Sequence, residues 1–470
     1  MTLAVRKHGV GHMRIPIAAR LLWGQHDLLP CRPGSIRMKR VLIITYYWPP
    51  SGGAGVLRWL KFSKYLREFG WEPVIYTPDA GETPGNDPTL IYEIPEGIEI
   101  LKQPIWEPYS IYKGLTGISK KYPIYSAFIN EEKEPSVIGQ KVSVWLRGNF
   151  FIPDARKFWI NRSVRFLKKY LEERPVMRIV STGPPHSMHM IGLGLKAHFP
   201  HIPWIADFRD PWTSSDFYDQ LMLSKWADNK HRQLEKKVLR TADKVIAVSW
   251  SWARELESIR DRPVRVITNG FDADDFRNHR SNLDNQFSII HAGSMNRNRN
   301  SCILWSALER LCRNHEAFRS NLKIILIGPT DYTIFESIER RGLTTNLEKI
   351  DRLPHKEALR RVCRSQLLLL PINRTPNDQG RIPVKLYEYL ASKRPVLCIG
   401  PLDGDAARVI RWTHAGKVLD FHDEAGVSKT LWDCYRDYCN GGLMGRTDEI
   451  EQFSYSELAK HMAAALDRPI

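Results

Sequence analysis

From residue 38 onward, short runs of Val, Ile and Leu alternate with longer segments that repeat apolar residues at helical spacing. The first repeat consists of RVLIITYY (40–47), a predicted strand, then the glycine-rich turn PPSGGAG (49–55), the helix VLRWLKFSKYLREFG (56–70) and the strand EPVIYTP (72–78). Buried parallel strands are continuous apolar runs, and helices connect them. The pattern therefore predicts an α/β protein built on parallel sheets.

The alternation occurs in two series. In the first series, four further strands are predicted at RIVST (178–182), PWIADF (203–208), KVIAVS (244–249) and VRVITN (264–269). The second series opens with FSIIHAG (287–293) and closes with GKVLD (416–420), and the aperiodic polar stretch 272–286 separates the two. We therefore predict two Rossmann-like, doubly wound domains that face each other across a cleft.

The predicted domains cover residues 38–275 and 285–450, and residues 451–470 are predicted to form a C-terminal helix that packs on one of them. Residues 80–150 interrupt the first series and predict an insertion in the first domain. Residues 1–37 lack a sustained apolar region and a small-residue cleavage site, so they do not resemble a signal peptide. We interpret them as a disordered tail or an over-extended start.

A chain of 470 residues with 43% hydrophobic and 26% charged residues has the composition of a globular protein with room for two cores. Its seven cysteines include no C-x-x-C pair, so they predict neither a disulfide framework nor a metal site and fit a reducing compartment. No run approaches the roughly 20 apolar residues that a membrane span needs. We expect a cytoplasmic protein that is not integral to a membrane.

The formal net charge of +17 suits a polyanionic partner, which includes nucleic acid, an anionic membrane and a phosphorylated substrate. No recognised nucleic-acid-binding motif accompanies the charge, so we expect no nucleic acid partner. The segment Trp145–Leu171 interleaves aromatic residues with Arg and Lys. It predicts either a surface that lies peripherally on anionic lipid at the inner face of the cell membrane, or a core helix with a solvated basic face.

Ligands of open α/β sheets bind beyond the carboxyl ends of the strands, so residues that directly follow a strand are candidates. Gly52 and Gly53 would let backbone amides approach a phosphate, with a merely tight turn as the alternative. His186 follows RIVST behind two prolines and is predicted to face the cleft, with a structural role as the alternative. Asp207 and Asp210 follow PWIADF and predict either substrate contact or a pair with the intervening arginine.

In the second series, Lys385 and Glu388 lie three residues apart and share one helix face. A carboxylate there is suited to two vicinal hydroxyl groups, and an ordinary intrahelical pair is the alternative. Arg297 and Arg299 follow FSIIHAG and are candidates to neutralise a diphosphate. No residues suggest a metal site.

YYWPPSGGAG, VITNGFDADDF, LPHKEALR and KLYEYLASKRPVL occur in an order and spacing that resemble bacterial glycosyltransferase family 4. TGPPHSMH followed by WIADFRDPW resembles a branch often found near surface-polysaccharide genes. The resemblance implies a GT-B fold with an acceptor-side first domain and a donor-binding second domain. It implies transfer of a sugar, with retention of configuration, from a nucleotide sugar to a glycan or lipid-linked acceptor. No cofactor and no metal on the diphosphate are implied.

Carried over by position, the resemblance implies that Gly52 and Gly53 lie near the donor phosphates, that His186 supports the transferring sugar and that Glu388 binds the donor ribose. The family usually has another glutamate eight residues before the one that corresponds to Glu388. That position is Gly380 in this chain, so the carboxylate for the sugar is missing.

The resemblance also implies an Arg and Lys pair on the diphosphate, for which Arg297 or Arg299 would supply one member and, by our own inference, Lys385 the other. Asp207 or Asp210 would orient the acceptor. Two rival functions remain. The missing carboxylate suggests a catalytically silent scaffold in a polysaccharide assembly complex, and a GT-B sugar-nucleotide epimerase or hydrolase would use the same cleft without a sugar acceptor.

Overall fold

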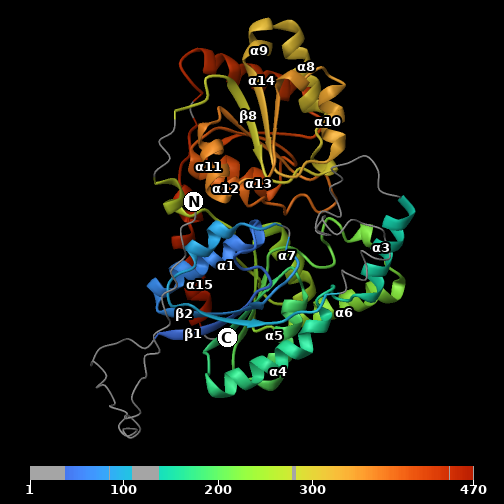
Figure 1. Cartoon of the computed structure of the whole chain (residues 1–470), viewed down its shortest axis with the longest axis vertical. Coiled ribbons are helices and arrows are strands. Elements are labelled where there is room, and N and C mark those ends of the chain that lie inside the picture. The colour runs from blue at the N-terminus through green and yellow to red at the C-terminus, as the bar shows by residue number, and fades with distance from the viewer. Residues whose placement is uncertain (1–37, 84, 108–136, 278–281, 444, 469–470) are drawn as a thin grey trace, which may run out of the picture. The chain divides into compact units, whose positions relative to one another are not determined.

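The apolar runs of the sequence become the strands of two parallel sheets (Figure 1). The computed structural model describes residues 38–83, 85–107, 137–277, 282–443 and 445–468. The tail predicted at residues 1–37 lies outside the described residues, as do parts of the predicted insertion and linker. Residues 38–470 belong to one compact unit, and the limits of the two domains within it stay a prediction.

The elements of the first half alternate as predicted. Their bounds are β1 Lys39–Ile44, α1 Ala54–Tyr65, η1 Leu66–Phe69, β2 Trp71–Pro78, η2 Pro88–Glu93, β3 Glu99–Gln103, α3 Val137–Phe150, α4 Lys157–Glu173, β4 Arg178–Gly183, α5 Ser187–His198, β5 Trp204–Phe208, η4 Asp219–Leu221, α6 Lys225–Thr241, β6 Lys244–Ala247, α7 Trp250–Arg260, β7 Arg265–Val266 and η5 Ala273–Phe276.

The second half continues the alternation to the end of the chain. Its elements are β8 Phe287–Ala292, η6 Arg297–Arg299, α8 Cys302–Asn314, α9 Glu316–Asn321, β9 Leu322–Ile327, α10 Tyr332–Glu339, η7 Thr344–Asn346, β10 Leu347–Ile350, α11 His355–Arg364, β11 Leu367–Pro371, α12 Lys385–Ser392, β12 Val396–Ile399, α13 Asp405–Trp412, β13 Gly416–Leu419, α14 Glu424–Cys439, η8 Ile450–Phe453 and α15 Tyr455–Asp467.

Both sheets have a doubly wound topology. The first has seven strands in the order β3-β2-β1-β4-β5-β6-β7, and the second has six in the order β10-β9-β8-β11-β12-β13. Each order reverses beside the first strand of its sheet, between β1 and β4 and between β8 and β11. Crevices outside the carboxyl ends of the strands at such switch points are where open α/β sheets bind ligands. The fold prediction of two Rossmann-like sheets is confirmed.

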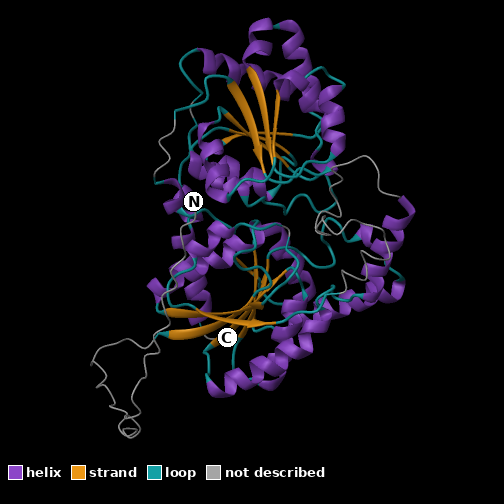
Figure 2. Cartoon of the chain, viewed as in Figure 1, coloured by secondary structure: helices purple, strands orange, loops and turns teal. Residues whose placement is uncertain are grey.

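Helices cover the strands of each sheet (Figure 2). In α4, the residues that face the core recur at helical spacing and are Trp159, Ser163, Leu167 and Leu171. The strands supply the other side of this core, and Val41, Leu42, Ile43 and Ile44 of β1 are fully buried. Burial of this apolar surface is the main stabilising contribution to the sheet. None of the helices in the described residues is long and apolar enough to cross a bilayer.

Two elements resolve points that the sequence left open or missed. Residues 99–103, inside the stretch predicted as an insertion, form β3 at the edge of the first sheet. An edge strand that is only half-buried has no continuous apolar run, so the pattern did not reveal it. The C-terminal helix α15 packs on the first sheet's core through residues such as Leu458 and Met462. Arg178 Nε and Lys244 Nζ donate to carbonyl groups at its last turn.

Candidate functional site

The glycine turn after β1 forms the start of α1. Gly53 precedes the helix with φ 96 and ψ 171, a backbone conformation that favours glycine. Gly52 donates its N–H to Gly85 O over 2.9 Å, which holds the turn against the chain that leads to Asp87. No side chain among the described residues caps this helix start. Its amide groups therefore lie at the switch point of the first sheet with the partial positive charge of a helix N-terminus.

Asp207 lies at the centre of a buried ion pair. Its Oδ1 accepts from Arg58 Nη2 over 2.9 Å, and both side chains are 0% exposed. Trp59 Nε1 and Thr182 Oγ1 donate to its Oδ2. Burial alone would raise the pKa of Asp207, but the Arg58 charge and these hydrogen bonds hold it below its usual value. The carboxylate joins α1, β4 and β5 and has no exposed surface, so the geometry gives the predicted acceptor contact no support.

His186 immediately precedes α5 and is almost fully buried. Its ring stacks on Trp212, with centroids 4.6 Å apart and planes 1° apart. Its Nδ1 has no hydrogen-bond partner in the described part of the chain. Burial, reinforced by the neighbouring His189, holds the pKa of the His186 imidazole well below its usual range. The ring is therefore neutral near pH 7, and its buried Nδ1 remains without a protein partner among the described residues.

The residues next to His186 fix its position. Asp154 accepts from the Ser187 N–H over 2.8 Å and from Ser187 Oγ over 2.8 Å, so it caps α5 one residue after the imidazole. His189 is fully buried and stacks on Phe208 with centroids 4.4 Å apart, while its Nδ1 lies 2.9 Å from Ser181 Oγ. His189 therefore packs in the core.

The arginine between the two predicted aspartates ties three segments of the site together. Arg209 Nη1 donates to Gly55 O over 2.6 Å, Nη2 donates to Pro184 O, and the guanidinium lies over the Tyr47 ring. Asp210 is half-buried. Burial raises the pKa of Asp210, and the charges of Arg381 and Arg209 oppose part of that rise. Of the two aspartates, Asp210 is the one that is only partly buried.

Two cations meet at the switch point of the second sheet. Lys385 Nζ, at the start of α12, lies 3.2 Å from His291 Nε2 on β8. A Cβ atom on Gly293 would fall 2.5 Å from Lys385 Nζ, so the glycine makes this approach possible. Burial, and then the nearby Arg299 guanidinium, holds the pKa of Lys385 well below its usual range.

Arg299 is the second of these cations. It donates to Ser294 O over 2.7 Å and to Asn373 Oδ1 over 2.6 Å. Burial lowers its pKa to about 10, and the charge of Arg381 adds to the effect. A bound anion would favour the charged forms of these two groups and raise their pKa values. Arg297, the other predicted candidate, is exposed to solvent on η6.

Glu388 is paired with a histidine. Its Oε1 lies 2.8 Å from His355 Nε2, and the two side chains are 19% and 15% exposed. Burial would lower the pKa of His355, but the charge and hydrogen bond of Glu388, together with the charge of Asp275, raise it above its usual value. The His355 N–H also donates to Asp87 Oδ2 over 3.0 Å. Gly85, which accepts from the Gly52 N–H, lies two residues before Asp87. His355 therefore links Glu388 to the chain segment that holds the glycine turn.

A further contact joins the two sheets beside Gly380. Asp216, in the loop after β5, forms a 2.6 Å ion pair with Arg381 and accepts from Asn373 Nδ2 over 2.7 Å. A Cβ atom at Gly380 would overlap the Trp252 indole of α7, so no larger side chain fits at this position as it stands. The segments around Gly52, Arg209, Arg299 and Glu388 are thus connected by contacts.

Several residues of this site were not identified from the sequence. They are Arg58, Trp212, Asp216, His291, His355, Asn373 and Arg381. Each of them contacts a partner that is distant in the sequence, so the local pattern does not reveal it. The exceptions are polar residues that closely follow a strand, such as Asn373 after β11, whose position could have marked them as candidates. Among the described residues, no group of three or more His, Cys, Asp or Glu side chains is arranged to hold a metal ion.

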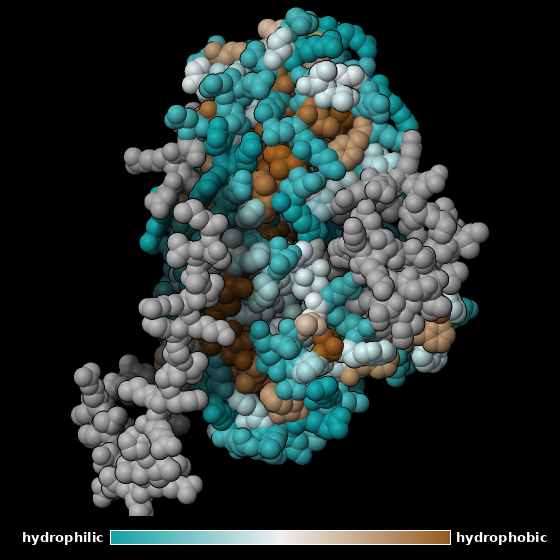
Figure 3. Space-filling model, in the orientation of Figure 1, coloured by the Kyte–Doolittle hydropathy of each residue, from teal (hydrophilic) through white to brown (hydrophobic). Residues whose placement is uncertain are grey.

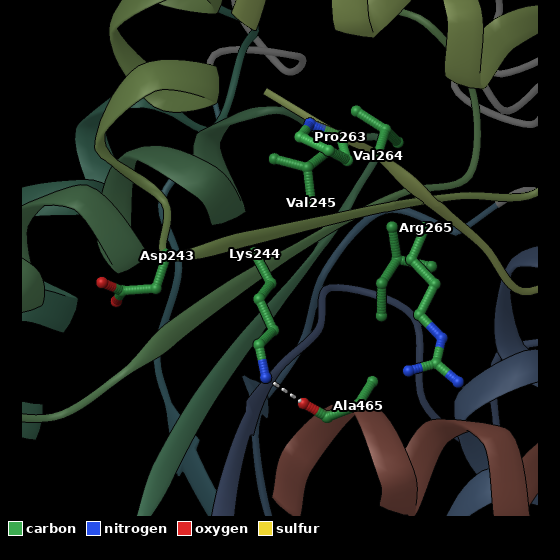
Figure 4. Close-up of a pocket in the computed structure, with 8 residues that line it drawn as sticks. Asp243, Lys244, Val245, Pro263, Val264, Arg265 and Ala465 are labelled. Atoms are coloured by element: carbon green, nitrogen blue, oxygen red, sulfur yellow. Dashed lines mark hydrogen bonds between the residues drawn. The ribbon is translucent and has the colours of Figure 1, made fainter. Parts of the chain in front are cut away.

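Figure 4 shows a pocket that lies elsewhere, at the amino ends of β6 and β7. Its lining includes Lys244 of β6, Arg265 of β7 with the preceding Val264, and Ala465 of α15. Lys244 Nζ donates to Ala465 O over 2.7 Å. Burial, with the charges of nearby arginines, lowers the pKa of Lys244. The pocket belongs to the docking of α15 and contains none of the predicted site residues.

An aromatic surface lies beside the turn between α3 and α4, and we define it by Trp106, Phe151, Lys157 and Phe158. Trp106 and Phe158 are 54% and 48% exposed, with ring centroids 5.0 Å apart. Lys157 Nζ lies 5.5 Å and 5.0 Å from the ring centroids of Phe151 and Phe158. In Figure 3, hydrophobic residues reach the surface in the part of the molecule where Figure 1 places α6.

The exposed face of α4 continues this surface. Phe158 is followed at intervals of three or four residues by exposed cations, which are Arg162, Arg165 and Lys169. The opposite face is the buried one described above, so the sequence-based alternative of a core helix with a solvated basic face is confirmed for α4. The aromatic end of the exposed face is not explained by that alternative.

A family model described as Glycosyltransferase Family 4 matches residues 130–275. The matched range contains the turn after β4 with His186 and the loop after β5 with Asp210 and Asp216. None of the curated protein sequences matches this chain.

Solved structures of known proteins share the fold over nearly the whole chain. A sucrose-phosphate synthase from Thermosynechococcus elongatus is 12% identical, with a TM-score of 0.58 over 91% of this chain and 98% of the other. A structure described as trehalose-6-phosphate from E. coli bound with UDP-2-fluoro glucose is 10% identical, with a TM-score of 0.57 over 92% and 100%. A UDP-N-acetylglucosamine 2-epimerase, described as putative, from Listeria monocytogenes is 10% identical, with a TM-score of 0.52 over 91% and 96%.

Proposed function

We propose that this chain, a glycosyltransferase of family 4 with a GT-B fold, transfers a sugar from a nucleotide-sugar donor to a glycan or lipid-linked acceptor with retention of configuration. The observation that carries the proposal is the crowding of Arg299 and Lys385 at the switch point of the second sheet. The Arg299 charge lowers the pKa of Lys385, and the Arg381 charge lowers that of Arg299, so partly buried cations in this arrangement gain from a bound polyanion. A nucleoside diphosphate is the polyanion that a doubly wound sheet suits best.

The transfer step places negative charge on the departing diphosphate. The bond from the anomeric carbon to the phosphate oxygen breaks, the bond to the acceptor oxygen forms on the same face, and the acceptor proton moves to the departing phosphate. Arg299, Lys385 and the amide groups at the start of α1 and α12 stabilise this charge because they are fixed in position before the reaction. Gly52 and Gly53 bring the α1 amides close to it.

His186 acts as a neutral hydrogen-bond partner of the transferring sugar. Its lowered pKa excludes a proton-donor role near pH 7, and the stack on Trp212 orients its polar edge. Glu388 binds the ribose hydroxyls, and His355 holds its carboxylate in place. Asp210 orients the acceptor, since the residue is only partly buried and Asp207 is fully buried.

Donor binding tests the proposal directly. A panel of nucleoside diphosphates and their sugars is screened by thermal shift, because a ligand at 100 times its Kd adds about 2.7 kcal/mol to the folded state. Arg299→Met and Lys385→Met are expected to weaken binding by about tenfold to a hundredfold, the range of a lost charge-assisted hydrogen bond. Arg297→Met is the matched control and retains binding. Unchanged affinity in the first two variants, or no stabilising ligand at all, contradicts the proposal.

Product analysis separates the rival functions. A transferase consumes the donor only with an acceptor extract and yields a product whose anomeric configuration, measured by NMR, matches the donor. An epimerase or hydrolase changes the nucleotide sugar without an acceptor, and a scaffold binds it without turnover. His186→Ala is expected to lower the transfer rate more than donor affinity, whereas Glu388→Ala is expected to weaken donor binding. Full turnover in the first variant overturns the role of His186.

The aromatic surface supports a lipid-linked acceptor in surface-polysaccharide synthesis at the inner face of the cell membrane. Trp106 and Phe158 would enter the headgroup region, while Lys157 and the cations of α4 neutralise lipid phosphates. The occupant of this surface is therefore an anionic bilayer. Each cation near such a membrane contributes about 1 kcal/mol to binding at physiological salt.

Vesicle sedimentation tests this contact. The chain is expected to pellet with phosphatidylglycerol vesicles and not with phosphatidylcholine vesicles. Arg162→Glu combined with Arg165→Glu should abolish pelleting, since about four units of charge are reversed near the surface. Lys236→Glu combined with Lys237→Glu, on the exposed face of α6, makes the same charge change elsewhere and should leave pelleting largely intact. Equal loss in both double variants would show a non-specific effect of net charge.

A further inference from the structure

The carboxylate of Asp216 is buried but only half satisfied. Its side chain is 8% exposed, and its Oδ2 is bound by Arg381 over 2.6 Å and by Asn373 Nδ2 over 2.7 Å. Its Oδ1 is buried and has no hydrogen-bond partner within the described ranges. Because a carboxylate oxygen only accepts hydrogen bonds, a partner for Oδ1 has to supply a donor.

The partner of Asp216 has the opposite deficit. Arg381 Nε is also buried without a hydrogen-bond partner in the part of the chain that is described, although its Nη2 is paired with Asp216. An arginine Nε–H only donates, so a partner for it has to supply an acceptor. Asp216 Oδ1 and Arg381 Nε thus belong to two side chains in contact, and the first needs a donor while the second needs an acceptor.

A hydroxyl-bearing ligand meets both requirements, and a phosphate does not. Sugar hydroxyl groups donate through O–H and accept through oxygen, so neighbouring hydroxyls can serve Asp216 Oδ1 and Arg381 Nε together. A phosphate oxygen would accept from Arg381 but would be repelled by the Asp216 carboxylate. The chemistry of the pair therefore selects hydroxyls.

The pair also lies beside the proposed diphosphate position. Asn373 donates to Asp216 through Nδ2 and accepts from Arg299 Nε through Oδ1 over 2.6 Å. One amide thus connects the half-satisfied carboxylate with the cation proposed to bind the diphosphate. A sugar attached to that diphosphate would begin within reach of this group.

Position 380, next to Arg381, has no room for a carboxylate of its own, whereas Asp216 reaches the same place from the first sheet. The Trp252 indole occupies the space that a side chain on Gly380 would need, and its Nε1 donates to Asn377 Oδ1 over 2.9 Å. Asn377 in turn donates to Ser214 O, two residues before Asp216. The loop after β5 therefore meets the second sheet at the place where a carboxylate on residue 380 is absent.

We infer that Asp216 and Arg381 form a subsite for a pair of hydroxyl groups on the transferred sugar, with Asp216 supplying from the first sheet the carboxylate that Gly380 does not provide. The inference rests on the proposed function, because the sugar reaches the subsite as part of a nucleotide sugar. It goes beyond that function by assigning recognition of the sugar itself to a loop of the opposite sheet.

Asp216→Asn is the informative variant. The amide oxygen can keep the contacts that Oδ2 makes with Arg381 and Asn373, while the amide nitrogen replaces the Oδ1 acceptor by a donor. Asp219→Asn makes the same chemical change on an exposed side chain three residues further along the loop and is the matched control. Equal melting temperatures of the ligand-free variants establish that folding is intact.

The measurement is the Kd, by calorimetry, of UDP and UDP-glucose, GDP and GDP-mannose, and ADP and ADP-glucose. For the pair that the wild type binds, Asp216→Asn is expected to raise the Kd of the nucleotide sugar about tenfold, or 1.4 kcal/mol, and to change that of the nucleoside diphosphate less than about twofold. Asp219→Asn is expected to change neither.

The outcomes separate the two claims. Equal weakening of diphosphate and nucleotide sugar by Asp216→Asn, or no weakening of either, overturns the subsite and leaves the proposed function standing. If the wild type binds none of these nucleotides in either form, the proposed function fails and the subsite fails with it. A ligand-free Asp216→Asn protein that melts well below the wild type overturns the subsite in favour of a structural latch.

Discussion

Replacing Asp207 should unfold the first sheet before it reveals any catalytic defect. The carboxylate is 0% exposed and neutralises Arg58, which is also 0% exposed. Asp207→Ala would leave the guanidinium with neutral acceptors only, namely the backbone carbonyls of Thr268 and Ile267 and the side-chain Oδ1 of Asn269. Removing one partner of a buried ion pair costs about 3–5 kcal/mol, because the remaining charge is uncompensated.

That loss is large against the total stability of a typical domain, about 5–15 kcal/mol. Urea unfolding followed by circular dichroism measures it, and Arg58→Met with the double variant completes a double-mutant cycle. The double variant should be less destabilised than the sum of the two single changes, since the stranded charge is gone. A stable Asp207→Ala protein that has lost only transfer activity would refute the structural role and restore the predicted acceptor contact.

Three further predictions concern positions where local geometry decides the outcome. Gly380→Glu, which restores the missing carboxylate, should lower the free energy of unfolding by about 1–3 kcal/mol through overlap with Trp252, measured by urea unfolding. Gly53→Ala should cost about 1–2 kcal/mol because φ is 96 there, and an unchanged unfolding midpoint would argue against this turn. His355→Gln should destabilise the ligand-free protein by about 1.5 kcal/mol at pH 6. Since the pKa of His355 is raised, its pairing with Glu388 stabilises fully below the unfolded-state pKa and is lost as pH rises through the folded-state pKa. The difference from the wild type should therefore shrink towards pH 9, and a constant difference would contradict the ion pair.

The sheets could be predicted because buried parallel strands are visible as apolar runs. The same logic located Gly53, His186 and Lys385, since each directly follows a strand or begins a helix near a switch point. The edge strand at 99–103 escaped because half-exposed strands lack such a run. Secondary structure is local, so its sequence signal is local too.

The partners of the site residues could not be predicted in the same way. Arg58 is part of an amphipathic helix that also carries Lys61 and Lys64, and nothing in the spacing shows that Arg58 and Lys61 are buried while Lys64 is partly exposed. The choice between Arg297 and Arg299 depends on the direction of a single turn. Asp216 finds Asn373 across 157 residues of sequence, a pairing that only the packing of the two sheets creates.

Asp154 gives the aromatic surface a mechanical connection to the chemistry. It lies in the same turn as Phe151 and Lys157, and its two oxygens hold the first residue of α5 directly behind His186. If a bilayer binds this turn as proposed, the displacement of Asp154 would reach Ser187 and so the backbone that positions the His186 imidazole. Transfer would then be activated at the interface, with a low rate for the enzyme in bulk water and a higher rate at a membrane that contains the lipid-linked acceptor.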